Sequence, residues 1–198
     1  MSNLLGEGGA RARALCRVHW RLGQALLPEH FERQELGLVR ELELRFAQLA
    51  PAGWGVAQID WDEASLARGI VRIPRLMAVT PRGHLVHLPA NARAAPLDLS
   101  SAESHLVTLY LHLLGEPVYE KEDERARDLE AVELAVRRVE LSLSPGHPDA
   151  VDSFALAELE QALDGLWAVR PAYVPALMSL AAWPSFFNPV AIWSKHRS

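Results

Sequence analysis

Histidine offers the most obvious chemistry in this chain, because eight histidines are present and several lie close together in sequence. Three pairs could in principle share a metal ion: His84 with His87, His105 with His112, and His19 with His30. If the first two pairs lie on β-strands, residues three or seven positions apart point to opposite faces and cannot chelate one ion. We therefore expect surface or half-buried histidines, and we predict no tight metal site and no cofactor.

Other side chains with catalytic potential lack the neighbours that catalysis requires. Three carboxylates lie close together, as acid/base chemistry would need, at Asp60, Asp62 and Glu63. No nucleophile or oxyanion donor accompanies them in sequence, so a solvated turn is the stronger interpretation. No nucleophile-elbow pattern surrounds Ser142, Ser144 and Ser153, and the glycines of residues 6–9 lack the lysine of a phosphate loop. We predict no catalytic residues and no enzyme activity.

Composition and charge exclude several classes of partner. The chain has 25 acidic and 20 basic residues, a net charge of −5 that gives no basic surface for nucleic acid or for anionic membranes. Cys16 is the only cysteine, so the chain forms no internal disulfide, as suits a reducing compartment. No apolar run approaches the ~20 residues of a membrane span, and the N-terminus lacks the apolar core of a signal peptide. We expect a cytoplasmic protein without direct membrane insertion.

Hydrophobic periodicity predicts one long helix near the N-terminus. Residues 1–18 are rich in glycine and arginine without periodicity, which predicts a flexible arm. From about residue 29 to 49, apolar residues recur at helical spacing with charges between them. Pro28 precedes this amphipathic helix, and a Pro-Ala-Gly run at 51–53 ends it.

The pattern beyond residue 53 changes to that of β-strands. Apolar, aromatic and β-branched runs bounded by turn signals predict strands at 54–61, 69–79, 84–88, 105–114 and 131–143. Pro74 marks an edge strand or a bulge, and 105–114 is apolar enough to be buried on both faces. Residues 153–169 also fit helical spacing, but the Asp164-Gly165 turn favours strand, turn, strand. The predicted fold is mainly β: an antiparallel β-sandwich, about 54–180, preceded by one long amphipathic helix.

Several of these segments resemble the TssK family, also called ImpJ or VasE, a baseplate component of the bacterial type VI secretion system. The family opens with a Trp, a Gly, two or three apolar residues and a Pro-Gln-His-Phe-like run, which here are Trp20, Gly23, residues 25–27 and residues 28–31. Further similar segments are the Trp-Gly-Val run at 54–56, the Pro-Arg-Gly turn at 81–83, Tyr119-Glu120 and residues 173–186. The chain departs at Glu29, often Gln in the family, and at Ala176, which replaces a proline.

This resemblance implies a structural adaptor rather than an enzyme. It implies a β-sandwich shoulder domain over residues 19–182, followed by an aromatic tail at 183–198, and binding to the baseplate subunits TssF and TssG, with a homotrimer as the assembly. The family's stalk and head, which reach the membrane complex, would follow this region, so we do not carry membrane docking over. The chain is then either an N-terminal fragment or a short homologue. The predicted binding residues are Trp20, Leu27, His30, Phe31, Trp183, Phe186 and Phe187.

The six tryptophans leave a second function open. Most should be core residues, but tryptophans exposed on a β-sandwich could stack on a sugar. The alternative hypothesis is therefore a small-ligand or carbohydrate-binding module. The aromatic tail, with Trp183, Phe186 and Phe187 among prolines, either packs against its own sandwich or meets a partner.

Overall fold

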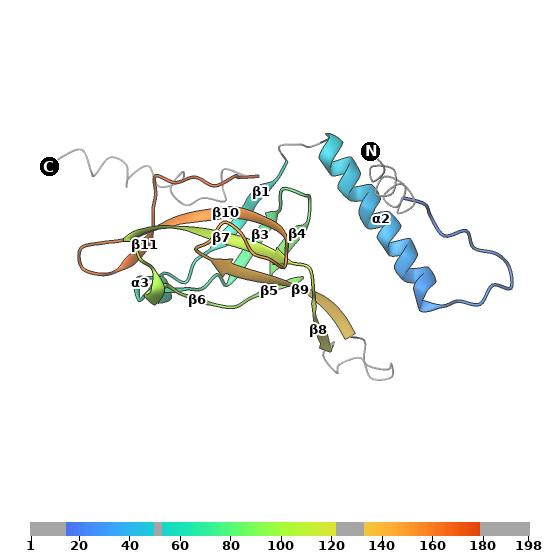
Figure 1. Cartoon of the computed structure of the whole chain (residues 1–198), viewed down its shortest axis with the longest axis horizontal. Helices are drawn as coiled ribbons and strands as arrows, with labels where there is room; N and C mark the ends of the chain where they lie inside the picture. The colour runs from blue at the N-terminus through green and yellow to red at the C-terminus, as the bar shows by residue number, and fades with distance from the viewer. Residues whose placement is uncertain (1–14, 50–52, 122–132, 179–198) are drawn as a thin grey trace, which may run out of the picture. The chain divides into compact units, whose positions relative to one another are not determined.

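The computed structural model describes residues 15–49, 53–121 and 133–178 of the chain (Figure 1). The chain divides into two compact units, residues 1–52 and 53–198. The predicted aromatic tail, with Trp183, Phe186 and Phe187, and most of the predicted N-terminal arm lie outside the described residues. No helix in the described ranges is long and apolar enough to cross a membrane.

The first unit contains the predicted long helix, α2 (Pro28–Leu49). Proline is favoured at the first helical position, where its missing N–H leaves no hydrogen bond unmade. Leu27 precedes it as the N-cap residue, and the His30 ring accepts the Leu27 backbone N–H at 3.3 Å, as the third residue of a capping box does. Among the described helices α2 is the longest, in agreement with the sequence.

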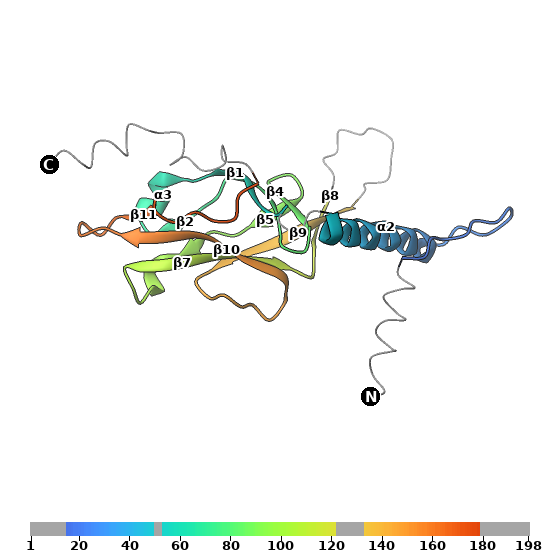
Figure 2. The same ribbon diagram turned by 90° about the horizontal axis from the view of Figure 1, so that it is seen from above.

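The second unit is β-rich, with two sheets that lie face to face (Figure 2). The smaller sheet has the order β1-β3-β4, and the larger has the order β11-β10-β7-β9-β5, with β8 paired to β9. A third, two-stranded sheet joins β2 and β6. The strand bounds are β1 (Gly55–Asp60), β2 (Ile70–Val71), β3 (Arg75–Val79), β4 (Leu85–Leu88), β5 (Ala92–Ala94), β6 (Leu97–Asp98), β7 (Leu106–Leu114), β8 (Val118–Lys121), β9 (Glu133–Ser142), β10 (Ala150–Gln161) and β11 (Trp167–Val169).

The hydrophobic core lies between the two main sheets. Val56, Leu76 and Val86 from the smaller sheet meet Leu111 and Leu156 from the larger one, and all five are essentially inaccessible to solvent. Alternation along the strands produces this core, because every second side chain points inward. Phe154 contacts Trp54 edge-on, with ring centroids 5.9 Å apart. The predicted β-sandwich and the strand, turn, strand arrangement at 153–169 are both confirmed.

Three details of the predicted strands were wrong. The run 69–79 is two strands, β2 and β3, and Pro74 lies between them rather than on an edge strand or in a bulge; β3 is the central strand of its sheet. The sheets are not wholly antiparallel, because β5 pairs with β9 in parallel. Strand β7 is buried on both faces only toward its C-terminal end, whereas Leu106 is 46% exposed.

The carboxylates at 60–63 form a helix start rather than a solvated turn. Asp62 is the N-cap of a short helix, α3 (Glu63–Ala67), and accepts the Ser65 backbone N–H at 3.0 Å and its hydroxyl at 2.7 Å. These bonds to Ser65 hold the pKa of Asp62 below its ordinary value, because they favour the ionised carboxylate. A further one-turn 3-10 helix, η1 (Leu99–Ser101), follows β6.

The segment after β11 returns to the smaller sheet. Val56 of β1 donates its N–H to the Ala176 carbonyl at 2.8 Å and accepts the Met178 N–H at 2.9 Å, which forms a parallel bridge at Leu177. Gly55 makes room for this bridge, since a Cβ atom there would lie 2.4 Å from the Ala176 carbonyl oxygen. Residues 176–178 therefore extend the smaller sheet beside β1.

Candidate protein-binding surface

The predicted binding residues of the N-terminal unit lie on a segment that folds back along α2, which holds Trp20 and Leu27, and on the first turn of α2, which holds His30 and Phe31. We call residues 15–27 the leading segment. It turns at residues 21–24, where the Gln24 N–H donates to the Arg21 carbonyl at 3.1 Å. Gly23 has φ +80° at the third position of this turn, a conformation that a type II turn requires and that glycine adopts without strain. The turn reverses the chain immediately before the helix begins.

Beyond the contacts of Gln24 and Leu27 with His30, two side-chain contacts fix the leading segment farther along the helix. The Trp20 indole N–H donates to Gln34 Oε1 at 2.9 Å, and Arg17 Nη2 lies 3.0 Å from Glu41 Oε2. Hydrogen bonds from Arg17 and then Arg45 lower the pKa of Glu41, because both favour the ionised carboxylate. These contacts lie two turns of α2 apart, so they align the segment with the helix over that length.

Three of the predicted binding residues form one aromatic cluster. Trp20 contacts Phe31 at 5.7 Å between ring centroids and His30 edge-on at 5.8 Å. Phe31 nevertheless remains 53% exposed, Trp20 39% and Leu27 49%. The cluster is therefore internally packed but open to solvent on its outer side.

The unit leaves many apolar side chains exposed. Residues 15–49 are under a quarter of the described residues, yet they hold more than half of the large hydrophobic side chains that are exposed. Leu22 is fully exposed at the tip of the turn and Leu26 is 65% exposed, and neither was predicted as a binding residue. The signal in the sequence that could have identified Leu22 and Leu26 as binding residues was their position between Trp20 and Pro28. On α2 itself the apolar stripe at Leu38, Leu42 and Leu49 is also exposed, and Gly37 is the buried residue.

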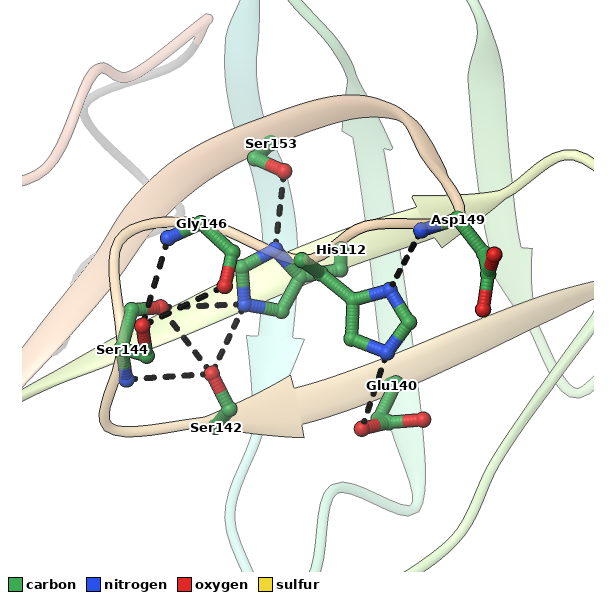
Figure 3. A network of polar contacts seen from close by, with 8 residues as sticks. His112, Glu140, Ser142, Ser144, Gly146, Asp149 and Ser153 are labelled. Carbon is green, nitrogen blue, oxygen red and sulfur yellow. Dashed lines mark hydrogen bonds and ion pairs between the residues drawn. The ribbon is translucent and has the colours of Figure 1, made fainter.

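The histidines predicted to be surface or half-buried include one that is fully buried. His112, in the buried C-terminal part of β7, is inaccessible to solvent and is hydrogen-bonded to two serines considered above as nucleophiles, Ser142 and Ser153 (Figure 3). His105 lies on the exposed end of the same region and bonds Gln161 instead. Across the described ranges, no three His, Cys, Asp or Glu side chains are grouped as a metal ion would need.

Ser142 is not arranged as a nucleophile with His112 as its base. The Ser142 hydroxyl donates to the Ser144 carbonyl at 3.0 Å, so its proton is directed away from the imidazole. The Ser144 N–H in turn donates to Ser142 Oγ at 3.1 Å. A serine whose oxygen accepts a backbone N–H and whose proton is held by a carbonyl is a structural hydrogen-bonding group rather than an activated nucleophile.

The tryptophans of the sandwich do not form an exposed stacking surface. Trp167 is 8% exposed in the core, and Trp54 and Trp61 are partly buried against it. Trp20, in the first unit, is the exposed tryptophan among the described residues. Among the described residues of the sandwich, no tryptophan is therefore exposed as stacking on a sugar would require.

Known proteins share both sequence and fold with this chain. Residues 30–117 match the family model described as bacterial type VI secretion, EvfL, ImpJ and VasE. The type VI secretion system baseplate component TssK1 of Pseudomonas aeruginosa is 32% identical over 87 residues, which are 43% of this chain and 20% of that protein. The chain resembles TssK. Only about a fifth of the TssK1 length is matched in sequence.

Solved TssK structures extend the resemblance to almost the whole chain. The chain superimposes on a chain of the TssK-TssF-TssG baseplate subcomplex of the type VI secretion system with a TM-score of 0.71, 23% identity, and coverage of 91% of this chain and 68% of that one. A crystal structure of TssK gives a TM-score of 0.71 with 18% identity, over 92% of this chain and 48% of the other. At these identities the likeness shows a shared fold, consistent with a TssK N-terminal region.

Proposed function

We propose that this chain is a non-enzymatic structural adaptor of a type VI secretion baseplate, working in the cytoplasm. The match of residues 30–117 to the VasE family carries the proposal, and the 32% identical relative is a baseplate component. The partners we propose are TssF and TssG, because a solved complex of similar fold contains TssK with these two proteins. Self-association as a homotrimer belongs to the same proposal and is measured by sedimentation equilibrium.

The surface that we propose for binding is the leading segment with the start of α2. Its anchors are Trp20, Leu27 and Phe31, with His30 holding the helix start beneath them. Exposed apolar clusters of this kind mark contact surfaces, and aromatic residues dominate the energetics of such contacts. Removing one large apolar side chain from water contributes about 1.5 to 3 kcal/mol, so a few such residues suffice for a specific interaction. Trp183, Phe186 and Phe187 remain proposed contacts outside the described residues.

The experiment is co-purification of TssF and TssG from the same gene cluster with the full chain. Trp20→Ala and Phe31→Ala should each weaken capture by about 30-fold, as loss of a contact of about 2 kcal/mol predicts. Both side chains also pack on each other, so a loss could reflect local unfolding.

A second variant separates contact from folding. Leu22 and Leu26 are exposed, so Leu22→Ala with Leu26→Ala should leave thermal stability unchanged and still weaken capture. The control is Leu163→Ala, a leucine as exposed as Leu22, on the turn between β10 and β11. If capture by the leucine double variant equals that of the control, the leading segment is not the contact surface. If the unaltered chain captures neither protein, the adaptor proposal itself is wrong.

A further inference from the structure

A buried imidazole joins three strands of the larger sheet to the loop between β9 and β10. We call residues 143–149 the β9–β10 loop. His112 on β7 lies opposite Ser153 of β10 and opposite Glu140 of β9 in the strand register. Its Nδ1 is 2.8 Å from Ser153 Oγ, and its Nε2 is 2.8 Å from Ser142 Oγ (Figure 3).

These contacts specify which ring nitrogen of His112 carries the proton. Nε2 also lies 3.1 Å from the Ser144 carbonyl oxygen, which can only accept a hydrogen bond, so the proton is on Nε2. Nδ1 is then the acceptor for the Ser153 hydroxyl. A neutral ring in this tautomer satisfies both nitrogens, and a second proton on Nδ1 would require the Ser153 hydroxyl to reverse.

A second histidine is held in the same tautomer by a group that cannot reverse. His147, in the β9–β10 loop, accepts the Asp149 backbone N–H on Nδ1 at 3.1 Å. Its Nε2 lies 3.4 Å from Glu140 Oε1 and carries the proton. A backbone N–H can only donate, so a proton on Nδ1 of His147 would place two donors against each other and break this bond. The two imidazole rings are 5.5 Å apart.

The surroundings of His112 oppose a positive charge. Burial, and then the neighbouring His147, lower the pKa of His112, because an imidazolium there loses hydration and faces a second cation. Glu140 from β9 is the acidic group that faces the pair, Tyr110 stacks on His112 from the same strand at 6.4 Å, and β10 contributes the neutral Ser153. One carboxylate cannot neutralise two imidazolium rings.

We propose that His112 and His147 form an acid-sensitive latch, in which the β9–β10 loop stays closed while Nδ1 of each ring accepts its hydrogen bond and opens when a proton on Nδ1 breaks that bond. Leu143 and Ser144 of the loop, with Ser142 at the end of β9, also line a hollow of about 510 Å³, whose other lining residues are Leu97, Ser101, Ala102, Glu103, Ser104 and Val107. Release of the loop therefore removes one wall of that hollow. The inference concerns the sandwich alone and does not depend on the proposed baseplate function.

Amide hydrogen exchange of the full chain at pH 7.5 and pH 5.5 tests the latch, with rates corrected for the intrinsic pH dependence of exchange. The amides of Ser144 and Asp149 should open at least about tenfold more at pH 5.5, since each proton taken up on opening changes the equilibrium by up to tenfold per pH unit. Imidazole ¹⁵N shifts should show the ring proton on Nε2, and Nδ1 as the acceptor, for both rings at pH 7.5.

His147→Asn is the variant that isolates the charge. The asparagine side-chain oxygen can accept the Asp149 N–H in an Asx turn but takes up no proton, so the loop should stay closed at pH 5.5. His87→Asn, at an exposed histidine of β4, is the matched control and should open like the unaltered chain. Equal protection of the native loop at both pH values would overturn the proposal. So would loop opening in His147→Asn equal to that of the unaltered chain, or an Nδ1–H tautomer on either ring.

Discussion

Alanine at Gly55 should detach the segment that follows β11 from the smaller sheet. Gly55 has φ +131°, a region that residues with a Cβ rarely adopt. The added Cβ would lie 2.4 Å from the Ala176 carbonyl oxygen, 2.5 Å from its carbonyl carbon and 2.8 Å from the Leu177 nitrogen. All three atoms belong to the backbone, so no side-chain rotation relieves the collision.

The expected loss of stability follows from two contributions. Backbone strain at such a φ for a residue other than glycine costs about 1 to 3 kcal/mol. Detachment of residues 176–178 removes the collision but breaks the two bonds of Val56 to Ala176 and Met178, which contribute about 0.5 to 1.5 kcal/mol each. Together they predict that the free energy of unfolding of Gly55→Ala falls by roughly 2 to 6 kcal/mol.

Urea unfolding with linear extrapolation measures this loss, and limited proteolysis measures detachment at residues 173–178. Gly165→Ala is the control for strain alone, because Gly165 has φ +83° and no atom within 4 Å of an added Cβ; it should cost about 1 kcal/mol. Gly146→Ala, with open space and no positive φ, should stay within about 0.5 kcal/mol. If Gly55→Ala matches Gly165→Ala in stability and resists protease like the unaltered chain, the bridge at Leu177 is not a stabilising contact.

Three further predictions use the same unfolding assay. The lowered pKa of His112 means that the unfolded chain binds more protons, so this contribution to stability is complete above about pH 6.5 and is lost as pH falls below it. The urea midpoint should therefore fall more between pH 7.5 and pH 5.5 for the unaltered chain than for His112→Asn. Equal falls in the two proteins would contradict the prediction. Asp152→Ala should lower the free energy of unfolding by about 0.5 to 1.5 kcal/mol, because Asp152 of β10 accepts the Arg82 N–H at 2.8 Å and so ties the β3–β4 turn to the larger sheet. Asp152→Asn keeps an acceptor and should lower it less. Equal losses in the two variants would show that this hydrogen bond is not the cause. Leu111→Ala in the core should cost about 2 to 5 kcal/mol, against a change within about 0.5 kcal/mol for the exposed Leu163→Ala; similar values for the two would refute the assigned core.

Much of this fold was readable from periodicity because its elements are long. Helix α2 and strands β7, β9 and β10 each contain enough residues for a period of 3.6 or 2 to emerge. Strands β5 and β6 and helix α3 contain five residues or fewer, and such short runs give no period. Their formation depends on tertiary context: β5 forms by pairing with β9, and α3 begins at the Asp62 cap.

His112 shows why the spacing of two histidines within one segment is not enough to predict their surroundings. Spacing correctly separates His105 from His112, since His105 bonds Gln161 at the surface and His112 is buried. The apolar run around His112 already predicted a strand buried on both faces, which should have placed His112 inside. Its partners, Ser142, Ser153 and His147, are 30 or more residues away, and the register that joins them is set by strand pairing.

The two units differ in how completely they bury their own apolar side chains, and this difference bears on where a partner would bind. In the sandwich, large apolar side chains fill a shared core, and the buried His112 has hydrogen-bonding partners for both ring nitrogens. In residues 15–49, polar contacts hold the leading segment in place while Leu22, Leu26 and Phe31 stay exposed. Ordering apolar side chains that stay in water costs conformational entropy, and no favourable free energy of burial offsets this cost. A surface fixed by polar contacts but left apolar outside is therefore suited to burial against another protein, and the leading segment is where we expect substitutions to weaken binding without unfolding the chain.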